Sequence, residues 1–337
     1  MAAFPPYGEE TLFSTKPLED PMQFRSLGKT GLSIAPLVFG GNVFGWTADD
    51  KTSFALLDAF TGAGFNAIDT ADVYSRWAPG NQGGESETII GTWLKRSGLS
   101  RDKVVVITKV GSDMGQGRRD LRKGWIVEAV EQSLKRLQTD HIDLYLSHWP
   151  DPETPYEETL EAHASLIKAG KVRAFGCSNL DAGQLRASFD AADRAGLPRY
   201  AALQPEYNLY DRAGFEGDLA DLCQKEDLGV ITYYSLASGF LTGKYRTKAD
   251  TEGTARGEGV VQYLDDKGLR ILAALDQAAA ETGAKPAEIA LAWLMAKPAV
   301  TAPIASATSL SQLASLTKAA TLTLTAEQMA ALDKAGA

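Results

Sequence analysis

Short apolar runs alternate with longer amphipathic stretches along most of this 337-residue chain. The apolar runs have the length of strands, and the stretches that follow them repeat apolar residues with the helical period of about 3.6. Eight such units follow one another, and no Pro-, Gly- or Ser-rich linker divides the two halves. This pattern is typical of one closed (β/α)8 barrel, a TIM barrel of the α/β class, and not of two separate domains.

The apolar runs and the periodic stretches give the expected element boundaries. Strands are expected at 36–39, 67–69, 104–107, 142–146, 174–177, 201–203, 229–232 and 300–304. Helices are expected at 52–63, 85–97, 125–138, 156–169, 181–195, 215–227 and 266–282 and from about 309, with an extra one at 286–296. Before the first unit, a Gly-containing turn between two short alternating segments at 23–34 predicts a β-hairpin.

The domain organisation follows from the same pattern. Residues 1–22 contain four prolines and little periodicity, which indicates an irregular N-terminal arm. We expect residues 23–337 to form a single barrel domain, with the hairpin and the extra helices added to it.

The composition is that of a globular protein with a negative charge. The chain is 44% hydrophobic and 23% charged, and its formal net charge is −9. Proteins that bind nucleic acid need a concentrated basic surface, so nucleic acid is not expected as a partner. We expect a small molecule as the partner instead.

Several sequence features predict a cytoplasmic protein without a metal. The N-terminus lacks the charged start and apolar stretch of a secretory signal, and no apolar run is long enough to span a membrane. Cys177 and Cys223 form no disulfide framework, and His141, His148 and His163 form no short ligand cluster. The sequence does not decide between a monomer and a homo-oligomer.

Polar side chains follow the apolar runs at the carboxyl ends of the expected strands, where (β/α)8 barrels place their chemistry. These residues are Asp69, Lys109, His148, Ser178, Asn179, Gln204 and Tyr233, and Tyr74 follows Asp69 by five positions. Taken singly, an aspartate after a strand is more often a turn former, and a histidine between apolar neighbours is more often a core residue. Candidates at three consecutive strand ends favour an active site.

The residue types also suit proton donation to a carbonyl group. A phenol, with a reference pKa near 10, is a reluctant donor unless its phenolate is stabilised. We expect Lys109 to lower the pKa of Tyr74, and Asp69 to keep the lysine charged and in place. His148 would then hydrogen-bond the carbonyl oxygen of a substrate.

These segments resemble those of the aldo-keto reductases over nearly the whole chain, from about residue 23 to 335. The resemblance rests on the segments 28–32, 69–74, 108–109, 176–179, 203–208 and 239–245 and on His148. Segment 239–245 is most similar to bacterial reductases that resemble the potassium-channel β subunits. The resemblance implies NAD(P)H-dependent, reversible reduction of aldehydes or ketones to alcohols, with Asp69, Tyr74, Lys109 and His148 as the catalytic set and Tyr74 as proton donor.

The resemblance also implies which residues hold the cofactor. Ser178, Asn179 and Gln204 match the side chains that bind the nicotinamide carboxamide, and Tyr233 matches the aromatic residue that stacks on the ring. Lys244 would supply positive charge near the pyrophosphate, beneath the loop 235–239. The full set of further expected contacts is Gly41, Asn42, Asp69, Ser235, Leu236, Ala237, Gly239, Lys244, Arg256, Ser306, Thr308 and Gln312.

The segment after the last expected strand departs from the family pattern. Gln312 is retained, but Thr308 stands where many relatives have the basic residue that pairs with the 2′-phosphate, and Ser315-Leu316 replace an acid and an amide. Losing a charge-assisted pair weakens a strict preference for the phosphorylated cofactor. We therefore expect NADP(H) first and leave NAD(H) open. Tyr234-Ser235 also replaces the Ser-Pro that is frequent in relatives.

Three tryptophans are candidates for the substrate pocket. Trp46, Trp77 and Trp149 lie in segments that follow expected strands, and Trp149 directly follows His148. Packing in the core or at an interface is the alternative for Trp46 and Trp77. The particular carbonyl compound is not specified by the sequence.

Two other functions are alternatives for a sequence of this kind. A nicotinamide enzyme built on a doubly wound sheet would carry a G-x-G-x-x-G turn after its first strand, and no such turn occurs here. Tyr263 and Lys267 have the Tyr-x-x-x-Lys spacing of short-chain dehydrogenases, but near the C-terminus and without that turn. A regulatory module that binds nicotinamide and senses redox state stays open, because channel β subunits keep the same catalytic set.

Overall fold

The computed structural model describes residues 22–337, and eight strands of this part form a closed barrel in the order β10-β3-β4-β5-β6-β7-β8-β9. The strands are β3 (Val38–Gly40), β4 (Ala67–Asp69), β5 (Val105–Val110), β6 (Ile142–Ser147), β7 (Val172–Ser178), β8 (Ala202–Gln204), β9 (Gly229–Thr232) and β10 (Ala302–Ala305). All neighbours in the ring are parallel, including β10 and β3, which close it. The predicted (β/α)8 barrel is confirmed.

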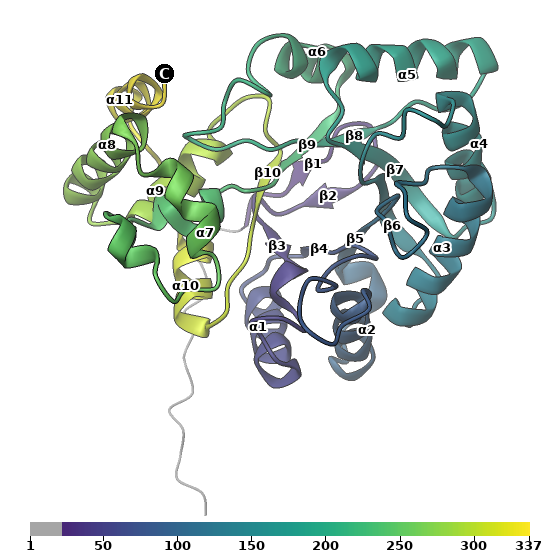
Figure 1. Ribbon diagram of the computed structural model, residues 1–337, viewed down its shortest axis with the longest axis horizontal. Helices are drawn as coiled ribbons and strands as arrows, with labels where there is room; N and C mark the ends of the chain where they lie inside the picture. The colour runs from purple at the N-terminus through teal and green to yellow at the C-terminus, as the bar shows by residue number, and fades with distance from the viewer. Residues whose placement is uncertain (1–21) are drawn as a thin grey trace, which may run out of the picture.

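Helices surround the ring of strands (Figure 1). They are α1 (Asp50–Gly62), α2 (Glu85–Arg96), α3 (Lys123–Leu137), α4 (Tyr156–Lys168), α5 (Ala182–Ala195), α6 (Asp218–Glu226), α8 (Asp266–Thr282), α9 (Pro286–Met295) and α10 (Leu310–Ala319). Their boundaries differ from the predicted ones by a few residues because caps decide where a helix begins. Asp49, for example, accepts a hydrogen bond from the Thr52 amide and starts α1.

The segment between β9 and α8 contains short helices that the sequence analysis did not predict. They are η3 (Ala237–Thr242), η4 (Lys248–Thr251), α7 (Gly257–Val260) and η5 (Val261–Tyr263). Helices this short show no hydrophobic period, and Ser238 and Gly239 have φ angles of 57° and 96°. A short 3-10 turn, η1 (Gly41–Val43), follows β3, another, η2 (Arg101–Lys103), precedes β5, and a helix α11 (Ala326–Ala335) ends the chain; none of these was predicted.

Alternation along the strands separates the interior of the barrel from the layer beneath the helices. Ile107 of β5 and Leu144 and Leu146 of β6 pack inside the barrel. Val106 and Tyr145, one position away, belong to the larger core between strands and helices. Because side chains alternate between the two faces, every second position of a strand is directed into the barrel.

The predicted hairpin is confirmed, and it closes the amino end of the barrel. β1 (Arg25–Ser26) pairs antiparallel with β2 (Ser33–Ile34), and Leu27, Leu32 and Ile34 pack against the interior side chains. Gly28 bridges Leu228 just before β9, with φ +50°, and a Cβ at Gly28 would lie 2.2 Å from the Gly229 nitrogen. Only glycine tolerates that approach in this conformation.

Three expectations concern the whole chain. Of the predicted N-terminal arm at 1–22, only Met22 lies within the described residues, and the domain boundary at residue 23 stays a prediction. Among the helices of residues 22–337, none is long and apolar enough to cross a membrane. The same residues contain no group of three or more His, Cys, Asp or Glu side chains arranged to hold a metal ion.

Candidate active site

A cavity of about 2140 Å³ lies at the carboxyl ends of the barrel strands, and we call it the mouth cavity. Each strand contributes a polar residue to its wall at or just beyond its end: Asn42, Asp69, Ser112, His148, Ser178, Gln204, Tyr233 and Ser306. Alternation accounts for most of these positions, since His148 continues the inward series of Leu144 and Leu146. The cavity exceeds the usual size of small-molecule pockets and suits a dinucleotide together with a substrate.

Asp69, Lys109 and Tyr74 form one hydrogen-bonded group beside the cavity, in which Asp69 and Lys109 are buried and Tyr74 is half-buried. Lys109 Nζ donates to Asp69 Oδ2 at 2.8 Å, to the Thr70 carbonyl at 2.7 Å and to the Tyr74 hydroxyl at 2.9 Å. The Tyr74 hydroxyl in turn donates to Asp69 Oδ2 over 3.3 Å. The three N–H bonds of the ammonium are thus all used, and one of them holds the phenolic oxygen.

The electrostatics of this group correct one expectation. Burial, and next the Asp69 carboxylate, raise the pKa of Tyr74 well above its usual value, whereas Lys109 was expected to lower it. Burial also lowers the pKa of Lys109, an effect that Asp69 opposes. Desolvation is the largest of these effects, because it disfavours the charged phenolate. In this structure Tyr74 is a neutral phenol and therefore carries a proton to donate.

His148 is buried against aromatic rings at the edge of the cavity. Its ring stacks on Trp149 with centroids 5.5 Å apart and meets Tyr74 edge-on at 6.1 Å. Burial, and next the charges of Lys109 and Arg119, hold the pKa of His148 well below its usual value, so the imidazole is neutral. Nδ1 lies 3.0 Å from the Ser112 hydroxyl. With Ser112 as the donor, the proton of the ring is on Nε2.

The residues expected at the nicotinamide carboxamide are brought together and bonded to one another. Asn179 Nδ2 donates to the His148 carbonyl at 2.8 Å, and Asn179 Oδ1 accepts from the Tyr233 hydroxyl at 2.6 Å. Ser178 Oγ donates to the Gln204 carbonyl at 2.7 Å, while Gln204 Nε2 donates to Asp69 Oδ1 at 2.8 Å. This network connects the expected carboxamide contacts to the catalytic group.

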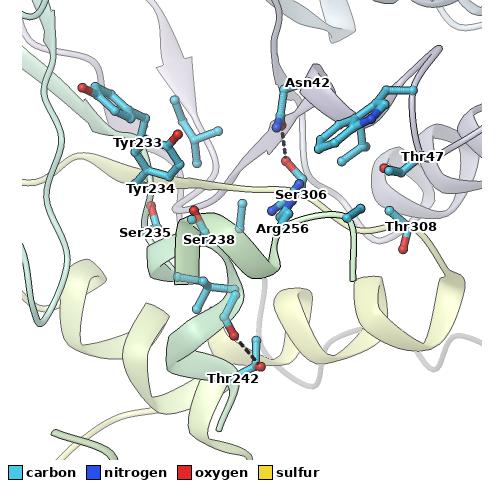
Figure 2. Close-up of a pocket in the computed structure, with 18 of the residues that line it drawn as sticks. Asn42, Thr47, Tyr233, Tyr234, Ser235, Ser238, Thr242, Arg256, Ser306 and Thr308 are labelled. Carbon is cyan, nitrogen blue, oxygen red and sulfur yellow. Dashed lines mark hydrogen bonds between the residues drawn. The ribbon is translucent and has the colours of Figure 1, made fainter. Parts of the chain in front are cut away.

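The expected pyrophosphate side lies along the loop after β9. Ser235, Leu236, Gly239, Lys244 and Arg256 line the cavity. Ala237, Ser238 and Gly239 have φ angles of 47°, 57° and 96°, and a Cβ on Gly239 would lie 3.9 Å from Lys244 Nζ. The amides of Ala237 and Gly239 donate within the loop, to the Tyr234 and Leu236 carbonyls, so Lys244 and Arg256 are the groups on this side that could bind an anion. Figure 2 shows this side of the cavity, with Ser235, Ser238 and Arg256 among the labelled residues.

The expected adenosine side lies at the start of α10. Ser306 Oγ donates to Asn42 Oδ1 at 2.6 Å, which joins the ends of β10 and β3 (Figure 2). Gln312 Oε1 accepts from both the amide and the hydroxyl of Thr308, at 2.8 and 3.1 Å. Ser315 Oγ donates to Glu288 Oε1 at 2.8 Å. The polar groups of Ser306, Thr308, Gln312 and Ser315 on this side are therefore hydroxyls and one amide.

The three candidate substrate tryptophans line the mouth cavity. Trp46 and Trp77 meet edge-on with centroids 5.8 Å apart, and Trp77 meets Tyr74 at 5.9 Å. The Arg256 guanidinium lies 5.7 Å from the Trp46 ring. An apolar wall thus borders the phenol that would donate the proton.

Two expected cofactor contacts do not reach the cavity. Gly41 and Ala237 are buried beside it and are not part of its wall. Many other wall residues were not predicted from the sequence, among them Ser112, Arg119 and Lys285. Ser112 could have been found as a polar residue just beyond a strand, whereas loop and helix cations carry no such signal.

Comparison with known proteins gives the family. The model of the Aldo/keto reductase family matches residues 36–337. The chain is 34% identical over 319 residues to the uncharacterized oxidoreductase YrpG of Bacillus subtilis, covering 93% of this chain and 95% of that protein. It is 31% identical over 337 residues to protein tas of Escherichia coli, covering 93% and 97%. It is also 36% identical over 308 residues to a probable voltage-gated potassium channel subunit beta of Oryza sativa subsp. japonica, covering 88% and 91%. The chain therefore belongs to the aldo/keto reductase family, a family of nicotinamide-dependent oxidoreductases.

Proposed function

We propose that the protein reduces small aldehydes or ketones to alcohols, reversibly, with Tyr74 as the proton donor and NADPH as the favoured cofactor. The observation that carries this proposal is the contact of 2.9 Å from Lys109 Nζ to the Tyr74 hydroxyl, at the carboxyl end of a barrel. The bound cofactor would supply a hydride to the carbonyl carbon. The remaining chemistry belongs to side chains of this chain.

Each catalytic side chain has one task. The neutral phenol of Tyr74 gives its proton to the carbonyl oxygen as that oxygen becomes an alkoxide. Lys109 then stabilises the phenolate through the hydrogen bond that it already makes. Asp69 holds the ammonium, and Nε2 of neutral His148 donates to the carbonyl oxygen and orients it. In the reverse direction the same groups remove the proton of an alcohol.

The choice of cofactor rests on the adenosine side of the cavity. Thr308 brings no charge to a 2′-phosphate, but Lys285 also lines the cavity. The Lys285 amide donates to Glu288 Oε2 at 3.1 Å, and Ser315 donates to the other oxygen of that carboxylate. The backbone of Lys285 is thus connected through Glu288 to Ser315, and the presence of this lysine in the cavity wall supports NADP(H). Use of NAD(H) is the alternative.

Steady-state kinetics with wild type and Tyr74→Phe test the proposal. The phenylalanine variant should lower kcat for aldehyde reduction roughly 10²- to 10⁴-fold, the usual effect of losing a general acid. Its affinity for NADPH should stay within about threefold, because the phenol acts in the chemical step. Parallel assays with NADPH and NADH give the cofactor preference. Full activity of the variant on every carbonyl tried would contradict the mechanism.

The relatives that are named as potassium channel subunits support a second candidate, a nicotinamide-binding module that senses redox state. Such a module would turn over slowly and release its cofactor slowly. Many turnovers per minute on simple aldehydes, with free exchange of the cofactor, favour the enzyme. A single turnover followed by retained oxidised cofactor favours the module.

A further inference from the structure

Arg119 is a cation in the wall of the mouth cavity that the proposed mechanism does not use. It belongs to the loop between β5 and α3, and it lines the cavity together with Tyr74 and His148. Its guanidinium lies over the Trp149 ring, 4.6 Å from the centroid. Trp149 in turn stacks on His148 with a ring distance of 5.5 Å. Two successive stacking contacts therefore connect this charge to the histidine that faces the substrate.

The same loop carries two more arginines, and both of them bind carboxylates. Arg118 contacts Asp151 at 3.1 Å and Glu153 at 2.7 Å, and Arg122 contacts Asp120 at 2.5 Å. Within residues 22–337, the Arg119 guanidinium has neither a carboxylate within 4.0 Å nor a hydrogen-bond acceptor. The loop thus neutralises the arginines beside the cavity wall and leaves the one in the wall with its donors unused.

We propose that Arg119 forms a subsite for an anionic group, a carboxylate or a phosphate, on the carbonyl substrate. The inference rests on the proposed function and gives it a substrate class, the aldehydes and ketones that carry a negative charge. A guanidinium offers planar, bidentate donors to such a group. Stacking on an indole fixes its orientation, so less conformational entropy is lost when the anion binds.

The charge balance of the chain strengthens this inference. With a formal net charge of −9, the protein as a whole repels anions, and an anionic substrate needs a local cation. Lys109 cannot serve, because its three donors are used and it is fully buried. Lys244 and Arg256 line the part of the cavity assigned to the pyrophosphate. Arg119 is the cation on the side of His148 and Trp149.

Matched pairs of aromatic aldehydes test the subsite with NADPH as the reductant. One pair is 4-carboxybenzaldehyde and its methyl ester, and the other is 4-formylphenyl phosphate and 4-methoxybenzaldehyde. The variants are Arg119→Gln, Arg119→Lys and, as the matched control on the same loop, Arg118→Gln. The ester group activates the aldehyde more than the carboxylate does. The test is therefore how the ratio of kcat/KM for the anionic substrate to kcat/KM for the neutral one changes between wild type and each variant.

Wild type should favour the anionic member, and Arg119→Gln should reduce the ratio of anionic to neutral substrate roughly tenfold or more, mainly through KM. Arg119→Lys should retain part of the preference for the anionic substrate, and Arg118→Gln should have the same preference as wild type. Added salt should lower the ratio, since an exposed pair is screened. The pair that shows the larger change identifies the group as carboxylate or phosphate. Equal ratios in wild type and Arg119→Gln for both pairs would overturn the subsite.

A binding measurement separates failure of the subsite from failure of the proposed function. Benzoate and phenyl phosphate have no carbonyl to reduce, and binding beside Trp149 should change tryptophan fluorescence. A response in wild type that Arg119→Gln loses supports the subsite even if no aldehyde is reduced. Reduction of neutral aldehydes without any such response or preference leaves the reductase proposal intact and removes the subsite.

Discussion

Two buried histidines of this protein have almost the same surroundings and opposite consequences. His148 lies 3.0 Å from the Ser112 hydroxyl and stacks on Trp149 at an angle of 15°. His163 lies 3.1 Å from the Ser147 hydroxyl and stacks on Phe175 at an angle of 3°. Burial lowers the pKa of both rings. Yet one ring borders the mouth cavity, and the other is enclosed between strands and α4.

The difference arises from the alternation of one strand. Ser147 ends β6 with its side chain in the outer layer, where it contacts His163, and His148 follows with its side chain at the cavity. A shift of one residue would exchange the two environments. Position relative to the carboxyl end of the barrel, and not the local chemistry, therefore separates a candidate catalytic histidine from a structural one.

Replacing each histidine should give the largest contrast. His148→Gln should lower kcat/KM for aldehyde reduction roughly 10²- to 10³-fold, as the loss of a donor to a developing oxyanion does. His163→Phe keeps an aromatic ring on Phe175 and should leave kcat/KM within about twofold. Initial rates, normalised to folded protein, measure both. Equal losses in the two variants would break the distinction.

Acid pH should destabilise the fold through His163. Burial lowers the pKa of this histidine from 6.5 to about 3, so its contribution is complete above pH 6.5 and is lost as the pH falls toward 3. Between pH 7.5 and pH 5.0 the free energy of unfolding should fall by about 2 kcal/mol on account of His163. At pH 5.0 its imidazole is protonated in the unfolded chain and neutral in the folded protein. Urea unfolding of wild type and His163→Phe at both pH values measures it.

The variant should therefore show a decrease of the unfolding free energy that is about 2 kcal/mol smaller than that of wild type. His148→Gln should also reduce the acid response, because burial lowers the pKa of His148 as well. An unchanged acid response in His163→Phe would mean that this ring is not held neutral by the core.

The serine partners should give the smallest effects. Ser112→Ala should reduce kcat/KM about fivefold. The variant removes the hydrogen bond to Nδ1 of His148, worth about 1 kcal/mol, that favours the tautomer with the proton on Nε2. Ser147→Ala should instead lower the free energy of unfolding by about 1–2 kcal/mol, since His163 and Tyr200 both lose a partner. Reversed effects would show that the two rings had been assigned the wrong roles.

The barrel could be predicted because its strands are buried on both faces and are continuous in apolar residues. The short helices of segment 237–263 could not be predicted. The backbone there has left-handed φ angles at Ser238 and Gly239. Helices this short do not show a helical repeat of apolar residues, so the sequence pattern does not predict them.

The candidate site divides in the same way. Residues at strand ends, such as Asp69 and Gln204, were accessible to prediction because alternation fixes the direction of their side chains. The raised pKa of Tyr74 depends on how far the folded chain removes the phenol from water, which no spacing reveals. Arg119 was missed because it lies in a loop, where no alternation fixes the direction of a side chain, and the sequence does not reveal that its neighbours Arg118 and Arg122 bind carboxylates.

The hairpin at the base of the barrel bears on the order in which the protein can fold during synthesis. Arg25 donates to the carbonyl of Met295, 270 residues further along the chain, and to that of Thr301. The interior side chains that pack with Leu27 and Ile34 extend from Val38 to Ile304, so part of their cover is made only late in synthesis. A chain truncated before Thr301 would lack β10 and one acceptor of Arg25, and its incompletely covered apolar side chains would be accessible to chaperones.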